Sequence, residues 1–310
     1  MDQYMMAFDV GGSYIKTAIL NDKGVIIPES IAVYPAKSQA SKEEILDHFI
    51  TMMSLQMHYI SSENYQVIGI GFAFPGPFDY QNGISYIQGI DKFDSLYGIN
   101  IREQLRERMK RDNEWMSKFA SDFVIVFEND ANLFALGEHK GGKGQHFNKV
   151  MYLTIGTGAG SAFMENDEFI TDDPRVPPNG WIYNQPFQQS IVDDYISKRG
   201  ILQLAKEFAV PNSDQEVKSL AEMAENNHEQ AIELFQQFGR NIGLAVNPYV
   251  DDFSPEAIII GGQIAKSIHL FISGIYVTLQ HKEVIIEASR ETSFSTFVGI
   301  AALIEKTSTD

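Results

Sequence analysis

Short runs of hydrophobic residues, bounded by Gly, Asn and Asp, alternate along the chain with longer segments in which hydrophobic residues recur at helical spacing. The runs 124–127 and 257–260 are continuously apolar, as is typical of buried strands. Ser41 and Glu44 form a predicted capping box, after which the apolar positions 45, 49, 52 and 53 mark the buried side of a helix. This alternation predicts an α/β protein in which helices pack on sheets.

Two stretches of the chain repeat one pattern. Residues 7–22 and residues 152–167 each read as strand, glycine-rich turn, strand and polar turn. Two unrelated β-hairpins could share this pattern by chance, because glycine-rich hairpin turns are common. The simplest explanation is a duplicated architecture with two domains. We expect a first lobe at 1–122 plus 296–310, which includes a returning helix, and a second lobe at 123–295.

Each repeat contains a turn suited to holding phosphate. The first is Gly11-Gly12-Ser13, with Asp9 before it and Lys16 after it, and the second is Gly156-Thr157-Gly158. Small residues leave backbone N–H groups open to phosphate oxygens. Neither turn has the spacing of a P-loop, and the second has neither the third glycine nor the helix start of a dinucleotide-binding motif. P-loop kinases and NAD enzymes are therefore excluded.

Polar residues follow the two apolar runs directly. Glu128, Asn129 and Asp130 come after the run 124–127 and precede a helical segment. Ligands of open α/β sheets bind at the carboxyl ends of strands, where a carboxylate can accept a proton from a substrate hydroxyl. An Asp at a helix start can instead be only an N-terminal cap. Gly261-Gly262 ends the second run and lets backbone approach a flat ligand closely.

Composition and charge narrow the function classes. The 310 residues are 44% hydrophobic and include 24 Lys plus Arg against 41 Asp plus Glu, a formal net charge of −17. An acidic surface repels polyphosphates, so no nucleic-acid partner is expected. The lack of cysteine excludes disulfides, thiolate nucleophiles and thiolate zinc sites. No apolar run approaches the ~18 residues of a membrane helix, and the first basic residue is Lys16, so the sequence predicts a cytoplasmic protein without a membrane partner.

Histidines and arginines indicate structure rather than binding. The histidines show no pair at metal-ligand spacing beside a carboxylate, so no transition-metal site is predicted. Basic residues alternate with Glu103 and Glu107 on a predicted helix that carries Arg102, Arg106, Arg108, Lys110 and Arg111. This alternation predicts a solvated helix face rather than a nucleic-acid-binding patch.

The order of the motifs is more specific than any one of them. The chain contains, in this order, Asp9-Val10-Gly11-Gly12-Ser13, Pro75-Gly76, Glu128-Asn129-Asp130-Ala131-Asn132, Gly156-Thr157-Gly158-Ala159-Gly160 and Gly261-Gly262. This succession resembles the ROK family of sugar kinases and sugar-responsive repressors, within the actin-like ATPase superfamily. The resemblance covers nearly the whole chain, although Ser13 stands where the family more often has Thr.

The resemblance implies an α/β fold of two actin-like, ribonuclease H-like lobes, each a mixed sheet flanked by helices, with a nucleotide and sugar cleft between them. It implies ATP and Mg²⁺ as cofactors, with Asp9 near the Mg²⁺. Asp130 would be the catalytic base that deprotonates a sugar hydroxyl during direct phosphoryl transfer. The other nucleotide-binding positions that the resemblance implies are Gly11, Gly12, Ser13, Lys16, Gly156, Thr157, Gly158, Gly261 and Gly262.

The predicted sugar site departs from the family's pattern. Many relatives carry a Cys-rich zinc motif after the second turn, whereas residues 172–190 contain neither Cys nor His, so no structural zinc is expected. The family's Glu-x-Gly-His segment aligns with Trp181-Ile182-Tyr183-Asn184, which replaces Glu by Trp and His by Asn. Trp181 could stack on a sugar or belong to the core. The implied substrate contacts are Gly76, Asn129, Asn184 and Asp193, the last in place of another sugar-binding Glu.

The expected substrate is a hexose or hexoside. Residues 87–94 are similar to a segment of the zinc-less β-glucoside kinases of the family, although the same stretch also reads as a surface turn. Glucose and N-acetylmannosamine remain competing substrates for the predicted carbohydrate kinase.

A transcriptional repressor and a sugar sensor are the two alternatives to a kinase. The repressor branch carries a DNA-binding segment ahead of the first turn, and only eight residues precede Asp9 here, so a transcription factor is not expected. The alternative is a non-catalytic or weakly catalytic sugar sensor, because the family's Glu and His equivalents are replaced. A homodimer is expected from the family alone.

Overall fold

The computed structural model describes residues 1–89, 91–211 and 216–309. Ile90, which belongs to the segment compared above with β-glucoside kinases, lies outside the described residues. None of the helices in the described part of the chain is both long and apolar enough to cross a membrane.

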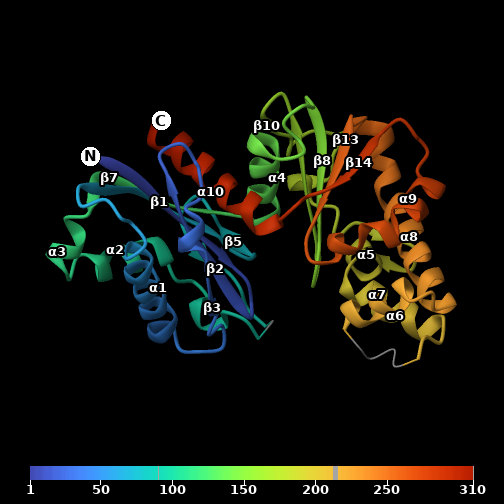
Figure 1. Ribbon diagram of the computed structural model, residues 1–310, viewed down its shortest axis with the longest axis horizontal. Coiled ribbons are helices and arrows are strands. Elements are labelled where there is room, and N and C mark those ends of the chain that lie inside the picture. The colour runs from blue at the N-terminus through green and yellow to red at the C-terminus, as the bar shows by residue number, and fades with distance from the viewer. Residues whose placement is uncertain (90, 212–215, 310) are drawn as a thin grey trace. The chain divides into compact units, whose positions relative to one another are not determined.

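Contacts divide the chain into two compact units. Unit 1 comprises Met1–Lys140 and Ser293–Asp310, and unit 2 comprises Gly141–Thr292. Each unit contains a five-stranded mixed sheet in the described residues, flanked by helices, as the sequence predicts (Figure 1).

Unit 1 begins with the first predicted hairpin. Its strands are β1 (Asp2–Val10), β2 (Tyr14–Asn21), β3 (Ala32–Pro35), β4 (Tyr65–Ala73), β5 (Phe78–Asp79), β6 (Ile84–Ser85) and β7 (Phe119–Glu128). Its helices are η1 (Pro28–Ser30), α1 (Lys42–Met57), η2 (Asp94–Leu96), α2 (Ile101–Met109), α3 (Asn113–Met116), α4 (Asp130–Gly141) and α10 (Thr292–Thr309). The capping box of α1 is present as predicted: Ser41 N–H donates to Glu44 Oε2 at 3.0 Å, and Glu44 N–H to Ser41 Oγ at 3.4 Å.

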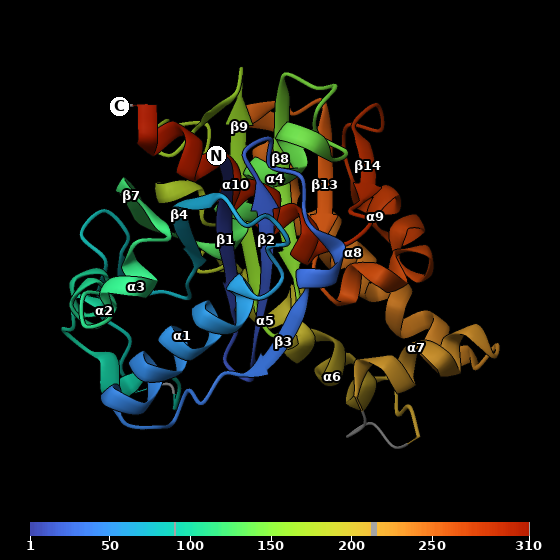
Figure 2. The same cartoon turned by 60° about the vertical axis from the view of Figure 1, so that its left-hand side comes forward.

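The sheet of unit 1 has the order β3-β2-β1-β4-β7. The hairpin strands β1, β2 and β3 are antiparallel, whereas β1, β4 and β7 run parallel, so the carboxyl ends of these three strands meet at one edge. One face packs on α1 and α2 through residues such as Phe8 and Phe49, and the other packs on α4 and α10 through residues such as Ala7 and Phe297 (Figure 2). The sheet that carries this edge is therefore packed between two hydrophobic cores.

Close helix packing fixes the position of α4. A Cβ at Gly137 of α4 would lie 1.7 Å from the Ser295 carbonyl oxygen, and a Cβ at Gly299 of α10 would lie 1.9 Å from the Leu133 carbonyl oxygen. Only glycine allows these two backbones to approach so closely. Ser295 Oγ also donates to Glu138 Oε1 at 2.5 Å. Helix α4, which begins at Asp130, is thus anchored to α10 through its middle turns.

Unit 2 contains the second predicted hairpin. Its strands are β8 (Lys149–Ile155), β9 (Ala159–Glu165), β10 (Glu168–Phe169), β11 (Pro186–Phe187), β12 (Ser190–Ile191), β13 (Ala257–Gly261) and β14 (Ile285–Ala288). Its helices are η3 (Pro178–Gly180), α5 (Val192–Ile196), α6 (Lys198–Glu207), α7 (Val217–Glu225), α8 (Glu229–Phe253), η4 (Ile264–Leu270) and α9 (Ile272–Thr278). Helices α5 to α9 share one hydrophobic core with β8 and β13.

The two sheets have the same topology. The order β10-β9-β8-β13-β14 repeats the order β3-β2-β1-β4-β7, with the same antiparallel hairpin and the same parallel strands beside it. Each glycine turn therefore occupies the equivalent place in its own sheet. This equivalence is what a duplication of one ancestral unit produces.

The division between units falls later than the sequence analysis placed it. The expected boundary at residue 122 lies inside β7, and β7 pairs with β4 in the sheet of unit 1. A buried apolar run does not reveal which of two sheets it joins, because both environments demand the same residues. Helix α4 follows β7 into unit 1.

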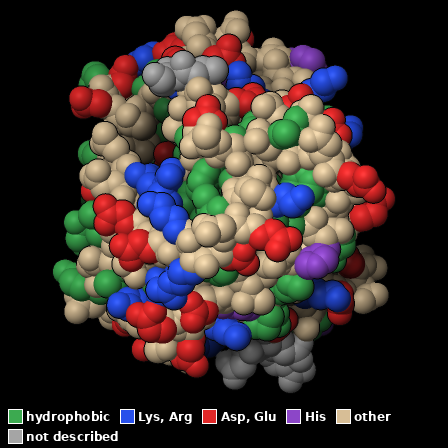
Figure 3. Space-filling model, turned by 90° about the vertical axis from the view of Figure 1, so that its left-hand side faces the viewer, with side chains coloured by type: hydrophobic (Ala, Val, Ile, Leu, Met, Phe, Trp, Pro, Cys, Tyr) green, Lys and Arg blue, Asp and Glu red, His purple; other side chains and the backbone are tan. Residues whose placement is uncertain are grey.

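The predicted solvated face of α2 is correct for part of the helix. Lys and Arg side chains alternate with Asp and Glu on the face of unit 1 around α1 to α3, without a continuous basic patch (Figure 3). Arg108, however, is only 7% exposed and forms ion pairs with Glu43 and Asp47 of α1. The prediction is wrong for this residue because the aliphatic part of an arginine side chain can pack against a neighbouring helix.

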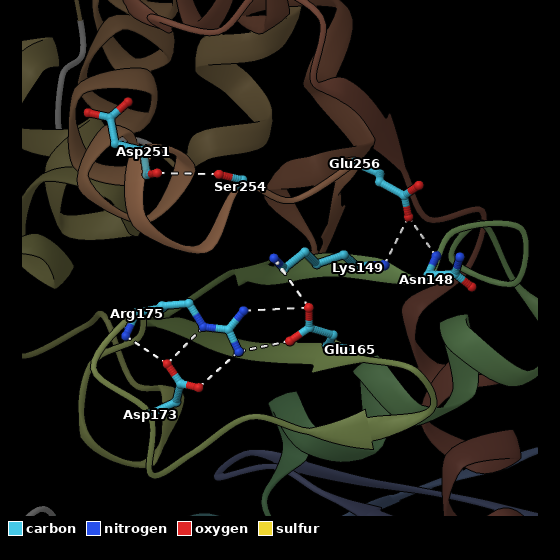
Figure 4. A network of polar contacts seen from close by, with 8 residues as sticks. All are labelled: Asn148, Lys149, Glu165, Asp173, Arg175, Asp251, Ser254 and Glu256. Atoms are coloured by element: carbon cyan, nitrogen blue, oxygen red, sulfur yellow. Dashed lines mark hydrogen bonds and ion pairs between the residues drawn. The ribbon is translucent and has the colours of Figure 1, made fainter.

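An ion-pair cluster holds the loop that follows β10. Arg175 donates to Asp173 Oδ2 at 2.9 Å and to Glu165 Oε2 at 2.8 Å, and Lys149 Nζ lies 3.2 Å from Glu165 Oε1 (Figure 4). These bonds lower the pKa of Glu165 and bring that of Asp173 to about 2. The stretch 172–190, which lacks Cys and His, is thus tied to β8 and β9 by charge pairs.

Candidate functional site

The predicted residues of unit 1 gather at the carboxyl edge of its sheet. Asp9 of β1 pairs with Lys16 of β2 on one side and with Ala73 of β4 on the other, and Ala73 pairs with Glu128 of β7. Residues paired across neighbouring strands project to the same face of a sheet. Asp9, Lys16 and Glu128 therefore project to the face of Ala73, which packs in the core with α4 and α10.

Asp9 lies between a cation and a second carboxylate. Lys16 Nζ is 3.9 Å from Asp9 Oδ2 and donates at 2.5 Å to Ser293 Oγ at the start of α10. Burial raises the pKa of Asp9 from 3.8 to about 6, the Lys16 charge opposes this shift, and the charge of Asp130 adds to it. Asp9 and Asp130 are thus close enough to repel each other, which favours a cation between them or a proton on one of them.

Asp130 is the first residue of α4. The Ala131 N–H donates at 3.0 Å to Asn129 Oδ1 and at 3.0 Å to Asp130 Oδ1, so local side chains cap the helix start. Solvent reaches the Asp130 side chain. The surrounding protein nevertheless desolvates the carboxyl group, and this raises its pKa against the opposing bond from Ala131. An accessible carboxylate with raised basicity has the properties of a general base.

Glu128 supports the loop that carries Asp130. Its Oε1 accepts from Asn129 N–H at 2.8 Å and from Asn132 Nδ2 at 3.0 Å, which ties the end of β7 to the first turn of α4. Burial raises the pKa of Glu128 as well. The sequence pattern alone assigns no role to Glu128.

The first glycine turn has open donors and an unforeseen neighbour. Gly11 N–H closes the turn by donating to the Tyr14 carbonyl oxygen at 3.0 Å. In the described part of the chain, the N–H groups of Gly12 and Ser13 donate to no protein acceptor, so they are available to an anion. The Lys92 side chain lies over the turn, because a Cβ at Gly12 would be 3.1 Å from Lys92 Nζ.

A buried carboxylate holds the second glycine turn in place. Gly156 N–H donates to the Gly158 carbonyl oxygen at 2.9 Å, and the Gly156 carbonyl oxygen accepts from Lys198 N–H at 2.9 Å. Asp193 is 8% exposed, and its Oδ1 accepts from Ala159 N–H at 2.6 Å. Its Oδ2 accepts from Arg199 of α6. Asp193 therefore supports the turn, and its predicted contact with sugar stays a prediction.

Gly261 ends β13, and Gly262 follows it with a φ of +94°. A Cβ at Gly262 would lie 2.2 Å from the Ile155 carbonyl oxygen at the end of β8. Gly262 N–H donates to Thr292 Oγ1 at 2.7 Å. Glycine is required here by both conformation and close approach, independently of any ligand.

The predicted sugar contacts belong to different units. Gly76 is exposed and Asn129 is half-buried, both in unit 1 near Tyr80: Asn129 Nδ2 lies 3.5 Å from Tyr80 Oη. Asn184 is exposed in unit 2, where its Oδ1 accepts from Gln185 Nε2 at 3.0 Å. The Trp181 and Tyr183 rings have centroids 6.1 Å apart in the same loop. Trp181 is half-buried, so it is not a core residue with its whole ring enclosed.

Three residues near the turns were missed in the sequence. Ser293 and Lys92 lie far along the chain from the first turn, and no local pattern links either residue to it. Glu128 could have been found from its place directly after a buried strand. Among the residues that the structure describes, no group of three or more His, Asp or Glu side chains is arranged to hold a metal ion by itself.

Curated sugar kinases are similar to this chain. A glucokinase from Halalkalibacterium halodurans is 21% identical over 86% of this chain and 82% of its own length. A β-glucoside kinase from Listeria monocytogenes is 30% identical over 53% of this chain and 47% of its own length. Xylose repressors from two Bacillus species match at 23% and 22% identity, so kinases and repressors are similarly distant relatives.

Solved structures share the fold of this chain, and a family model matches its sequence. A ROK family glucokinase from Streptomyces griseus, solved with glucose and AMPPNP, superposes with a TM-score of 0.71 at 21% identity, covering 98% of this chain and 99% of that one. A glucokinase from Parabacteroides distasonis superposes with a TM-score of 0.77 at 18% identity, covering 98% of each chain. The model of the ROK family matches residues 5–307. The chain belongs to the ROK family.

Proposed function

We propose that this protein is an ATP-dependent sugar kinase that transfers the γ-phosphoryl group to a hydroxyl of a hexose or hexoside. The observation that carries the proposal is the arrangement of Asp130, an accessible carboxylate with a raised pKa, beside Asp9 and the open first glycine turn. The sugar kinases among the relatives support the same activity class.

In this reaction Asp130 accepts the hydrogen bond of the acceptor hydroxyl. As the sugar oxygen forms its bond to phosphorus, the bond from phosphorus to the β-phosphate bridging oxygen breaks, and the hydroxyl proton passes to Asp130. Asp130 must be ionised to begin, so its raised pKa sets the acid side of the pH range. Because solvent reaches Asp130, the proton can leave before the next turnover.

The residues at this edge fit a magnesium nucleotide. Asp9 supplies a carboxylate oxygen, the ligand type that Mg²⁺ prefers alongside water and phosphate. Burial raises the pKa of Asp9 to about 6 even with Lys16 at 3.9 Å, so a bound cation would stabilise the ionised carboxylate. When bound, Mg²⁺ would neutralise charge on the β- and γ-phosphates.

The glycine turns hold phosphate oxygens in this proposal. The free N–H groups of Gly12 and Ser13, and those of Thr157 and Gly158, donate to no acceptor in the described residues. Such donors are prearranged and need no reorganisation as charge develops on the phosphoryl group. Gly261 and Gly262 form a flat backbone surface for the adenosine.

The acceptor sugar would contact Gly76, Asn129 and Asn184. A β-glucoside, glucose or N-acetylmannosamine is the proposed class, with the β-glucoside first because of the segment 87–94 and the 30% identity to a β-glucoside kinase. Homodimerisation is proposed from the family, and sedimentation at micromolar concentration tests it.

A sugar sensor without turnover is the second candidate. Two observations favour it: Asn184 stands where the family has His, and both oxygens of Asp193 are bonded to protein groups. Xylose repressors are also among the relatives. The kinase is preferred because Asp9 and Asp130 are retained together with both turns.

A coupled assay of ADP release with Mg-ATP separates the two functions. The panel contains glucose, mannose, fructose, N-acetylmannosamine, N-acetylglucosamine, cellobiose and aryl β-glucosides, with Asp130→Asn as the control. Release that one sugar stimulates and the variant abolishes supports the kinase. No release from any sugar, with sugar still raising the melting temperature, supports the sensor.

A further inference from the structure

A pocket adjoins the first glycine turn on the side of residues 37–40. It is a shallow, open depression with a volume of about 420 Å³. The residues that line it are Gly12, Ser13, Lys37, Ser38, Gln39 and Ala40. Five of these six carry polar side chains or the open N–H groups of the turn.

Hydrogen bonds between distant segments fix the walls of this pocket. Ser38 Oγ donates to the Gly12 carbonyl oxygen at 2.6 Å, which ties the wall to the turn. Phe93 N–H donates to the Ser38 carbonyl oxygen at 2.6 Å, and Ser95 Oγ donates to the Ala40 carbonyl oxygen at 2.9 Å. The segment that carries Lys92 is thereby held against the wall. The pocket is a built feature rather than a gap beside a loose loop.

The backbone at Lys37 is also constrained. Its φ is +51°, an uncommon conformation for a residue with a side chain, and Ala40 N–H closes the turn by donating to the Lys37 carbonyl oxygen at 2.9 Å. Such conformations persist where surrounding structure imposes them. The constraint places a lysine at the pocket.

Positive charge is concentrated here without a counter-ion. Lys37 lines the pocket and Lys92 lies over Gly12, and within the described residues neither ammonium forms an ion pair. Glu44 feels the charge of Lys37, but its carboxylate is committed to Ser41 in the capping box. In a chain with a net charge of −17, two lysines without an ion pair attract an anion.

We propose that this pocket binds a phosphate group distinct from those of the nucleotide. Lys37 and Lys92 would supply charge, and the Gln39 side-chain amide would supply a further donor. The phosphate could be inorganic phosphate or belong to a sugar phosphate, since both present the same group to the two lysines. The pocket shares Gly12 and Ser13 with the nucleotide site, so any effect on turnover rests on the proposed function, whereas binding of the anion does not.

Calorimetric titration of the full chain with inorganic phosphate tests the proposal without any turnover. The buffer contains no phosphate, and chloride at matched ionic strength is the reference. Lys37→Gln and Lys92→Gln are each expected to weaken phosphate binding about tenfold, the loss for one charged hydrogen bond. Lys23→Gln removes an exposed lysine away from the pocket and should bind phosphate like the natural chain. Equal affinity in all four proteins would overturn the proposal.

Two further titrations identify the site and the source of the phosphate. With AMPPNP present at saturation, phosphate must still bind, and complete displacement by AMPPNP would assign the ion to the nucleotide's own site and refute the inference. Hexose 6-phosphate replaces inorganic phosphate in the second titration. Tighter binding of the sugar phosphate that depends on Lys37 and Lys92 identifies a phosphorylated sugar as the occupant, and equal binding identifies free phosphate. If the natural chain binds phosphate as expected but shows no kinase activity, only the proposed function is rejected.

Discussion

The two glycine turns have the same place in equivalent sheets and opposite electrostatic surroundings. The first turn lies among ionised side chains that are incompletely paired: Asp9 has a pKa of about 6, and Lys92 lies over the turn without an ion pair in the described residues. The carboxylate beside the second turn, Asp193, is buried and satisfied by Ala159 N–H and Arg199. One duplicated hairpin therefore carries charges that the protein compensates incompletely, and the other lies beside a carboxylate that the protein satisfies.

This difference indicates how a duplicated unit divides its tasks. Burial without full charge compensation raises carboxyl pKa values and leaves capacity to bind cations and protons, at a cost in folding stability. A satisfied carboxylate fixes backbone geometry and contributes no such capacity. Substitutions at the two turns should therefore fail in different ways.

The largest expected effect is at Asp130. Replacing Asp130 by Asn should lower kcat for sugar-dependent ADP release by about 10²- to 10⁴-fold, because the variant cannot accept the hydroxyl proton, while sugar binding persists. Desolvation raises the pKa of Asp130. As the pH is lowered, kcat/KM of the natural protein should therefore begin to fall at a pH above the ordinary carboxyl pKa. The variant should not show this acid-side decrease. Asp193→Asn should leave kcat nearly unchanged. Similar kcat losses in both variants would remove the distinction between the turns.

Replacing Asp9 by Asn should stabilise the folded protein at pH 8. Its pKa rises from 3.8 unfolded to about 6 folded, so the folded protein binds the proton more tightly and loses stability as pH increases through that window. A shift of roughly two units corresponds to about 3 kcal/mol at most. Asp9→Asn should therefore melt several degrees higher than the natural protein at pH 8, with the difference vanishing toward pH 4, and should lose activity. Asp22→Asn, an exposed surface change, is the control. A lower melting temperature for Asp9→Asn at pH 8 would contradict the cost of burying the ionised Asp9 carboxylate.

Removal of Asp193 should weaken nucleotide binding rather than chemistry. Asp193→Ala leaves the Ala159 N–H without its acceptor, a loss of about 1–3 kcal/mol that loosens the second turn. We expect KM for ATP to rise about tenfold with kcat little changed. Asp194→Ala removes the neighbouring half-buried carboxylate, which also pairs with Arg199, and should alter neither constant. An increase in KM for the sugar, with KM for ATP unchanged, would instead support the sugar contact that the sequence predicted for Asp193.

The sequence predicted those features that depend on local pattern. The hairpin strands, the capping box at Ser41 and the place of Asp130 after a buried strand follow from spacing and turn chemistry, and the structure has them. The partners of the turns could not be predicted, because Lys92 and Ser293 reach the first turn through tertiary packing. The same limit applies to Asp193, since a carboxylate in a sequence does not reveal whether an Arg and an N–H will satisfy it.

The smallest expected effect tests whether the second glycine turn binds the phosphates of ATP. A Cβ at Gly156 would meet no heavy atom within 4 Å, and the same is true at Gly141 at the end of α4. Gly156→Ala and Gly141→Ala should thus fold equally well. Only Gly156→Ala should raise KM for ATP, by a few-fold, because its methyl group would occupy space that phosphate oxygens need. Unchanged KM in both variants would mean that phosphate does not approach this turn, leaving the first turn to hold the nucleotide without its duplicate.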